Sequence, residues 1–207
     1  MNSNVSACPS LLRVPLHRLR PTQAAVGMRA VAQKRHKVEK HVSAPSRVER
    51  YLNDRPIPSV IGPGGRLFMI DHHHLGLALW QADVETAFVL VVADYSVLPV
   101  GMFWHRMELD GRVRPFDETG RRIAPSKLPK RIKGLRDDAY RDLAWSVREA
   151  GGYQKSPAPY SEFDWADFFR TRISSRLIDG HYATAVRKAL RLCRTREAKH
   201  LPGFIAP

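Results

Sequence analysis

The chain has 207 residues, 43% of them hydrophobic, and a formal net charge of +14. This length suits one ordinary domain or one domain with an appendage. No apolar run approaches the roughly 20 residues needed to cross a bilayer, and the N-terminus lacks a secretory signal, so we expect no membrane partner. Cys8 and Cys193 match no metal spacing and no disulfide framework, which predicts free thiols in a cytoplasmic protein.

The positive charge is concentrated in two segments. Residues 1–50 carry ten Lys/Arg against two acids, and residues 112–136 carry nine against two. Residues 51–111 carry three against seven. Such an imbalance favours a polyanionic partner, namely nucleic acid, a nucleotide or anionic lipid. The alternative is a basic protein from a genome with Arg-rich usage.

The first hundred residues predict an α/β arrangement. A short strand is expected at 11–16, and apolar residues at turns of three or four predict a helix over 26–41. Ser46 is a candidate cap for a short helix that follows. Two β-rich runs, 59–61 and 67–70, flank a Gly-Pro-Gly-Gly sequence, which is typical of a β-hairpin.

The spacing of the hydrophobic residues changes at His72 from a period of two to a period of about 3.6. A helix is therefore expected there, with Leu75, Ala78 and Leu79 on one face. The nearly unbroken apolar run over 87–94 then predicts a strand buried on both faces.

The second half is expected to be helical after a turn-rich, basic segment at 110–136. A helix should begin at an Asp cap at 137–138 and end at Gly151-Gly152. Another should begin at Ser161, with Asp164 completing a variant capping box. A last helix is predicted from about residue 181.

Three consecutive histidines in FMIDHHHLGLALW, residues 68–80, stand between the expected strand and helix. Successive helical side chains are about 100° apart, so His72, His73 and His74 cannot all point at one ion on a regular helix. On an extended segment His72 and His74 would share a face, and a third metal ligand would have to come from elsewhere. A metal site therefore remains an alternative.

The same junction suggests an anion site. The first turn of a helix exposes unpaired N–H groups and a partial positive charge, which together favour anions. Asp71 could cap that turn. A neutral His nearby could donate a hydrogen bond or act as a general base. The simpler interpretation is that one His packs, one caps and one is solvated.

This strand–Asp–His–His–helix junction resembles the ParB/sulfiredoxin-like superfamily, whose box is D-G-E-R-R-like in ParB partition proteins and D-G-H-H-R-like in free-serine kinases. It is most similar to the ParB-like nuclease family, which carries a D-H-H-H-L box. The resemblance covers roughly residues 13–205. Further similar stretches lie at 19–29, 56–75, 91–96, 128–145, 150–170 and 200–204.

The resemblance implies an α+β fold: a ParB/sulfiredoxin-like mixed sheet with helices over 11–109, a basic turn-rich connector over 110–136, and a helical C-terminal region over 137–207 packed on the core. It also implies a phosphate-binding pocket at the box, where Asp71 matches the box aspartate, and His73 and His74 match the two histidines. The box glycine is His72 here.

Another departure is Leu75, which replaces the box arginine that usually clamps phosphate. Sulfiredoxin-type chemistry is not expected, because that box needs a Cys.

Other residues are candidates for phosphate or substrate binding. Gln23 could orient a substrate through its amide, or could be an ordinary turn residue. Arg20 and Arg29 flank it and could supply the missing positive charge. Lys130 and Arg131 could contact phosphate, or could lie in a solvated loop.

Four acidic residues have two possible roles each, a simple structural role and metal binding. Asp137-Asp138 is interpreted first as a helix cap and second as a metal site. Asp164 and Asp167, three residues apart, could hold a divalent ion or form a solvent-facing edge.

Two functions follow. The first is a phosphate-ester enzyme, a nuclease or a nucleotide-dependent phosphotransferase, with Asp71, His72, His73 and His74 as catalytic residues and a divalent metal ion or a nucleotide as cofactor. His73 or His74 would be the general base. The second is a non-catalytic DNA-binding, partition-like or adaptor protein, binding mainly through charge, since no helix-turn-helix is evident.

Overall fold

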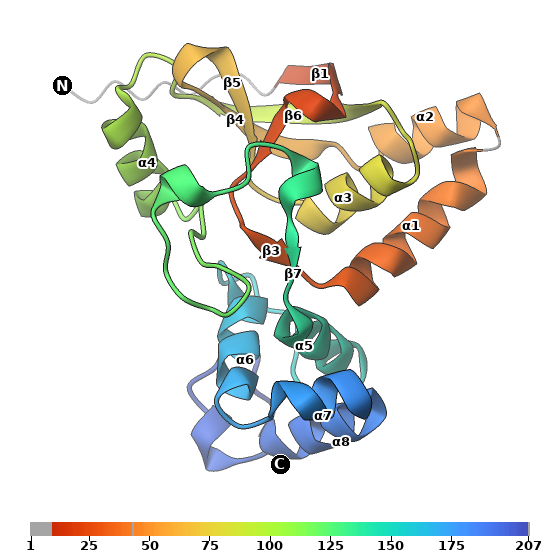
Figure 1. Ribbon diagram of the computed structural model, residues 1–207, viewed down its shortest axis with the longest axis vertical. Coiled ribbons are helices and arrows are strands. Elements are labelled where there is room, and N and C mark those ends of the chain that lie inside the picture. The colour runs from red at the N-terminus through yellow and green to blue at the C-terminus, as the bar shows by residue number, and fades with distance from the viewer. Residues whose placement is uncertain (1–9, 43, 207) are drawn as a thin grey trace. The chain divides into compact units, whose positions relative to one another are not determined.

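The computed structural model describes residues 10–42 and 44–206. They form two compact units. The α/β unit comprises the described residues of Met1–Val26 and Val31–Arg136, and the helical unit those of Gly27–Ala30 and Asp137–Pro207. Figure 1 shows the main strands in the first and the helices α5 to α8 in the second.

A five-stranded mixed sheet forms the α/β unit. Its order is β1 (Ser10–Pro15), β6 (Thr86–Asp94), β4 (Ile57–Gly62), β5 (Arg66–Met69) and β2 (Leu19–Pro21). The predicted hairpin is confirmed, since β4 and β5 are antiparallel neighbours. Gly64 and Gly65 in its turn have φ of 71° and 68°, which glycine adopts without a Cβ clash. The β4–β6 and β2–β5 pairs are parallel.

The prediction for β6 is half wrong. Ala87, Val89, Val91 and Ala93 are buried, whereas the residues between them are only half-buried. One face therefore lies in the core and the other is partly covered. The strand is nonetheless central, because β1 and β4 pair with its two edges.

Helices lie on both faces of the sheet. The unit contains α2 (Pro45–Asn53), α3 (His73–Gln81), α4 (Val100–Leu109) and most of α1 (Met28–Val42). The short strands β3 (Ala25–Val26) and β7 (Arg136–Asp137) stand where the units divide in sequence. The cap predicted for α2 is wrong: Pro45 is its first residue and Ala44, not Ser46, precedes it.

Neighbouring residues of β5 show how α3 and α4 are placed. The Met69 side chain lies against Gly76 of α3, where a Cβ would come within 2.9 Å of the Met69 methyl carbon. The Phe68 ring packs on Phe103 of α4 with 4.8 Å between centroids. Adjacent side chains of a strand point to opposite faces, so α3 and α4 cover opposite faces of the sheet.

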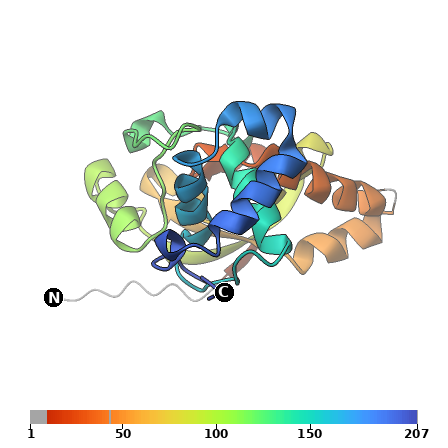
Figure 2. The ribbon, with the colours of Figure 1, turned by 90° about the horizontal axis from the view of Figure 1, so that it is seen from below.

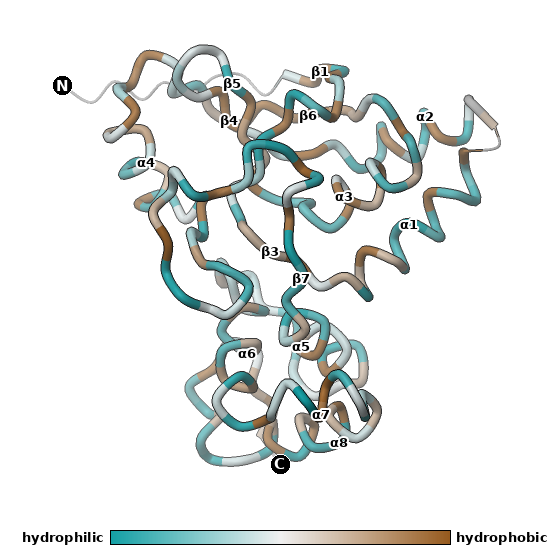
Figure 3. The backbone as a smooth tube through the Cα atoms, viewed as in Figure 1, coloured by the Kyte–Doolittle hydropathy of each residue, from teal (hydrophilic) through white to brown (hydrophobic). Residues whose placement is uncertain are grey.

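The helical unit contains α5 (Ala139–Glu149), α6 (Ser161–Arg170), α7 (Ser175–Gly180) and α8 (Tyr182–Leu192). Hydrophobic and hydrophilic residues alternate along these helices (Figure 3), and Figure 2 gives a second view of them. Trp165 is fully buried and stacks on Tyr153 at 4.3 Å. Its Nε1–H donates to the Pro202 carbonyl.

The two predicted helix starts in this unit differ in outcome. Asp138 caps α5 as predicted, accepting the Tyr140 N–H at 3.0 Å. The capping box predicted at Ser161 and Asp164 is wrong. Tyr160 is the cap residue in a left-handed conformation, and its carbonyl accepts the Phe163 and Asp164 N–H groups.

No helix among residues 10–42 and 44–206 is long and apolar enough to span a membrane. Cys193 is a buried free thiol whose pKa is raised to about 12 by burial. Cys8 lies outside the described residues.

Candidate functional site

The box begins with an exposed Asp71 and a strained His72. His72 has φ 61° and ψ 26°, the left-handed region, and α3 begins at the next residue. The Asp71 Oδ1 accepts the His72 N–H at 2.6 Å. Asp71 therefore holds the turn before the helix rather than capping the helix itself, which corrects the expected role. His72 occupies the position where related boxes carry glycine, and a non-glycine residue there costs about 1 kcal/mol or more.

The environment of His72 keeps its imidazole neutral. Burial lowers its pKa below the ordinary 6.5, and the charges of Lys34 and Arg55 lower it further. The Asp71 carboxylate and a hydrogen bond to the Pro56 backbone oppose this shift. Within the described residues, Nδ1 is shielded from solvent and has no hydrogen-bond partner. The ring is thus an uncharged base near two cations.

His73 has a different surrounding. It is 2% exposed, and its Nε2 accepts the N–H of Thr22 at 3.1 Å. The Thr22 hydroxyl donates to the Met69 carbonyl at 2.9 Å. A nitrogen that accepts an N–H carries no proton, so this arrangement requires the neutral tautomer protonated at Nδ1. His73 therefore joins α3 to the loop after β2. His74 is half-buried.

The loop after β2 reaches the box through Thr22 rather than through Gln23. Gln23 is buried, and its backbone forms an isolated bridge with Arg114.

In the described part of the chain, no group of three or more His, Cys, Asp or Glu could hold a metal ion.

Arg29 belongs to the helical unit. Its guanidinium lies 3.9 Å from the centroid of the Tyr182 ring, a cation–π contact. The backbone N–H of Arg29 donates to Asp142 Oδ2 at 2.8 Å, and the backbone N–H of Ala30 donates to Asp142 Oδ1 at 3.0 Å. Asp137 accepts the Met28 N–H at 3.0 Å. Two carboxylates thus cap the first turn of α1, and the Arg29 side chain packs on Tyr182.

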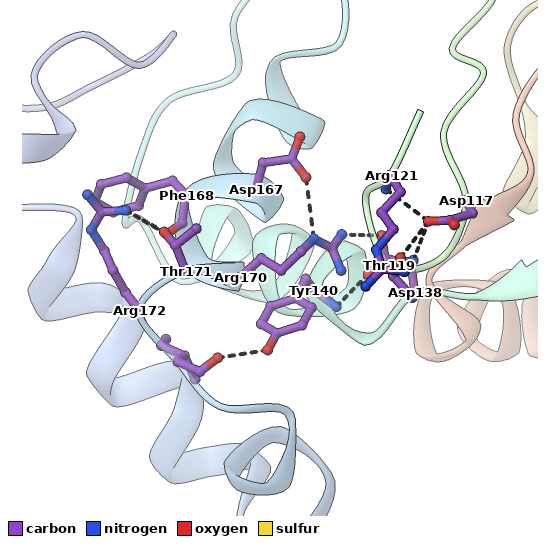
Figure 4. Close-up of polar contacts among 11 residues, drawn as sticks. Asp117, Thr119, Arg121, Asp138, Tyr140, Asp167, Phe168, Arg170, Thr171 and Arg172 are labelled. Carbon is purple, nitrogen blue, oxygen red and sulfur yellow. Dashed lines mark hydrogen bonds and ion pairs between the residues drawn. The ribbon is translucent and has the colours of Figure 1, made fainter. Parts of the chain in front are cut away.

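Two candidate carboxylates of the helical unit, Asp138 and Asp167, are paired with one arginine. Arg170 contacts Asp138 at 2.7 Å and Asp167 at 3.4 Å (Figure 4). Burial nevertheless raises the pKa of Asp138 against the effect of Arg170. The capping role expected at the start of α5 is therefore confirmed for Asp138, whereas Asp137 accepts a backbone N–H at the start of α1 instead.

Two cavities of the α/β unit collect most of the remaining basic candidates. The larger has a volume of about 720 Å³. Its charged lining residues are Lys127, Lys130, Arg131, Lys133, Arg136, Asp117 and Glu118. The smaller, about 290 Å³, is lined by Arg20, Arg66 and Lys130 among others. The structure thus brings Arg20 together with Lys130, and Lys130 together with Arg131. Neither lining includes the three histidines.

A family model described as Putative ParB-like nuclease matches residues 12–171. The chain belongs to the ParB-like nuclease family. The structure is also similar to the crystal structure of protein Atu1540 from Agrobacterium tumefaciens, with a TM-score of 0.87 and 42% identity over 96% of this chain and 99% of that one. No curated protein matches the chain. The resemblance inferred from the D-H-H-H-L box is thus confirmed, as is the fold class.

Within this ParB-like nuclease family member, sequence reasoning missed two cations at the box. Lys34 lies on α1 and Arg55 follows α2, so their approach to His72 depends on tertiary structure. It also missed Arg66. This residue opens the second strand of the predicted hairpin, and its positive charge at that place was visible in the sequence. The loop candidates Lys130 and Arg131 were found from charge alone.

Proposed function

We propose that this ParB-like nuclease family member binds the phosphodiester backbone of nucleic acid along residues 127–136. The proposal rests on the larger cavity, whose five basic side chains face two acidic ones. Lys and Arg gathered in a concavity raise the local concentration of a polyanion and supply contacts to phosphate.

The acids of this cavity are already engaged. Asp117 Oδ1 accepts the Thr119 and Arg121 N–H groups at 2.9 Å and the Thr119 hydroxyl at 2.7 Å (Figure 4). Its pKa is lowered first by the Thr119 hydrogen bond. Glu118 pairs with Arg136 at 2.8 Å. The lysines and Arg131 are therefore the charges available to a phosphate.

The backbone of this segment is held by its apolar residues. Leu128 and Ile132 are 6% and 2% exposed, while Lys130, Arg131 and Lys133 are exposed. The segment is anchored on one side and presents its cations on the other. Such contacts position a backbone without reading its sequence.

Replacing Lys127, Arg131 and Lys133 together by Ala should weaken binding of a labelled DNA duplex by about tenfold or more, similarly for all sequences. The dependence of log affinity on log salt should become shallower by about 2.7, because each lost phosphate contact contributes about 0.9. Anisotropy titrations between 50 and 200 mM salt would measure both.

The matched control removes three exposed arginines of the helical unit, Arg176, Arg187 and Arg191, and so changes net charge equally. It should leave the slope within about one unit of wild type. No duplex binding by the wild type at about 50 mM salt would remove the proposal, as would equal losses in both triple variants.

A second candidate function, hydrolysis of the bound phosphodiester, is favoured by His72, whose pKa is lowered by burial and by the charges of Lys34 and Arg55. We assign the general base to His72 rather than His73, because the Nε2 of His73 already accepts the Thr22 N–H. His72 would take a proton from water as the water oxygen attacks phosphorus. The ester P–O bond then breaks, and the leaving alkoxide oxygen takes a proton from solvent. The two cations would stabilise the developing charge.

In this proposal Asp71 holds the turn through the His72 N–H, and His74 lines the first turn of the helix. The shielded Nδ1 requires the His72 ring to turn outward before it can meet a water.

His72→Ala is expected to reduce hydrolysis of a DNA or RNA oligonucleotide by about a hundredfold or more. The fall of the wild-type rate with decreasing pH should have its midpoint below the ordinary imidazole pKa of 6.5, since burial lowers the pKa of His72 and only the neutral ring is a base. Hydrolysis measured with each common divalent ion, against exposed His105→Ala, tests this. Equal rates in both variants would exclude His72 as the base.

A further inference from the structure

The smaller cavity has an aromatic wall on the α4 face of the sheet. Phe68 of β5 and Phe103 and Trp104 of α4 form it. Trp104 meets the Phe68 ring edge to face at 5.3 Å and 83°, and the Phe103 ring at 4.9 Å and 60°. Two buried rings therefore fix the half-buried indole, which can present a flat surface to a ligand.

Positive charge surrounds this wall. Arg20 of β2 stands opposite Phe68 in the register, and Arg66 precedes Phe68 by two residues on the same strand. Both guanidinium-bearing residues thus share the face of the sheet that carries the Phe68 ring. Lys130 contributes a third cation from the loop.

Within the part of the chain that the structure describes, these three cations have no acidic partner. The described residues that line the cavity include no Asp or Glu. Among residues 10–42 and 44–206, neither Arg20, Arg66 nor Lys130 forms an ion pair. Burial lowers the pKa of Arg20, and the charge of Arg66 lowers it further. Like charges held together in this way are stabilised by a bound anion.

Most of the remaining lining residues are apolar. Four prolines with fixed φ contribute to the lining, which limits the ordering cost of binding. They are Pro21, Pro63, Pro125 and Pro129. A volume of about 290 Å³ is at the lower end of small-molecule pockets, so one small ligand fits.

We infer that this cavity binds one unpaired nucleobase together with its phosphate: the base stacks on Trp104 and the phosphate pairs with Arg20, Arg66 and Lys130. Flat aromatic surfaces with adjacent cations are how proteins hold unpaired bases. A base inside a duplex is stacked and paired, so it cannot enter. The ligand is either a free nucleotide or one nucleotide of a single strand. The inference draws on the proposed function only for the second source.

The experiment follows tryptophan fluorescence during titration with thymidine 5′-monophosphate and with an oligonucleotide of about ten thymidines. Both ligands should quench the wild type, and the quench should be lost in Trp104→Phe, which keeps an aromatic face. Binding of the monophosphate but not the oligonucleotide would assign a free nucleotide, and tighter binding of the oligonucleotide a single strand.

The charge arm uses Arg66→Gln, an exposed position whose substitution should leave the fold intact. Monophosphate affinity, measured by calorimetry, should fall by about tenfold, the cost of one charge-assisted contact. Arg20→Gln should act in the same direction, and Arg47→Gln on α2 should bind like wild type. Equal affinity in all three variants overturns the inference.

The base arm compares ligands. Thymidine and inorganic phosphate should each bind the wild type more weakly than the monophosphate, because each lacks one half of the contacts. Trp104→Ala should lose about tenfold in monophosphate affinity, whereas Trp104→Phe should not. If Trp104→Ala does not fold, the ligand comparison decides. Inorganic phosphate that binds as tightly as the monophosphate overturns the inference, as does no binding of either thymidine ligand.

Failure here is distinguishable from failure of the proposed function. Arg66→Gln should bind duplex DNA as wild type does, since Arg66 lines only the smaller cavity of the two. Monophosphate binding without duplex binding would remove the proposed function and leave the cavity assignment standing. Duplex binding without monophosphate binding would remove the cavity assignment and leave the proposed function standing.

Discussion

His73→Ala is expected to lower the free energy of unfolding by about 3 kcal/mol. The substitution leaves the buried Thr22 N–H without its acceptor, which costs about 1–3 kcal/mol. It also empties the volume of a side chain that is 2% exposed, on the helix face that carries the buried Gly76 and Leu77. Urea denaturation followed by far-UV circular dichroism would measure the loss.

Two further variants of the same box test the two causes of its stability, the Thr22 contact and the left-handed backbone. His73→Gln offers an amide oxygen to Thr22 and should recover part of the loss. His72→Gly should instead stabilise the protein by up to about 1 kcal/mol, because glycine adopts φ 61° without a Cβ clash. A His73→Ala protein as stable as wild type would show that the Thr22 contact is dispensable.

Asp142→Ala is expected to cost about 3 kcal/mol as well. The carboxylate accepts two N–H groups, of Arg29 and Ala30, at the start of α1. Its loss leaves two helix-terminal donors without a partner at a site where Asp142 itself is 3% exposed. The loss is smaller than two separate caps would suggest, because burial raises the pKa of Asp142 and so opposes the charged form.

The control for this cap is Asp142→Asn, which keeps one acceptor oxygen and should lose about half as much. Gly27→Ala tests the same contact from the other side. A Cβ at Gly27 would clash with Asp142 Oδ1 and would lie 2.8 Å from its backbone nitrogen. Thermal unfolding of the three variants should rank Asn as the mildest, and an unchanged midpoint for Asp142→Ala would refute the capping role.

Local pattern was enough to predict the hairpin, α3, α5 and the D-H-H-H-L box. It failed at α4 because that helix mixes core and surface apolar residues. Phe103 and Met107 are buried, but Met102 and Leu109 are 60% and 69% exposed, which hides the amphipathic period. The missed helix supplies Trp104, so the smaller cavity could not be predicted either.

The different roles of the three histidines could be predicted in part from the sequence. On α3, His73 precedes Gly76 and Leu77 by three and four residues, and all three are buried. That spacing favours a core role for His73 over a catalytic one. Lys34 and Arg55 were not predictable at the box, because their proximity to His72 depends on how α1 and α2 fold back toward it.

Lys130 lines both basic cavities, and this sharing has a thermodynamic consequence. One ammonium group cannot pair fully with two separate anions, so independent guests should antagonise each other, by the same factor in either order of addition. A continuous strand escapes this penalty, because its covalent connection raises the effective concentration of the second phosphate once the first is bound. The geometry thus favours tethered over loose anions.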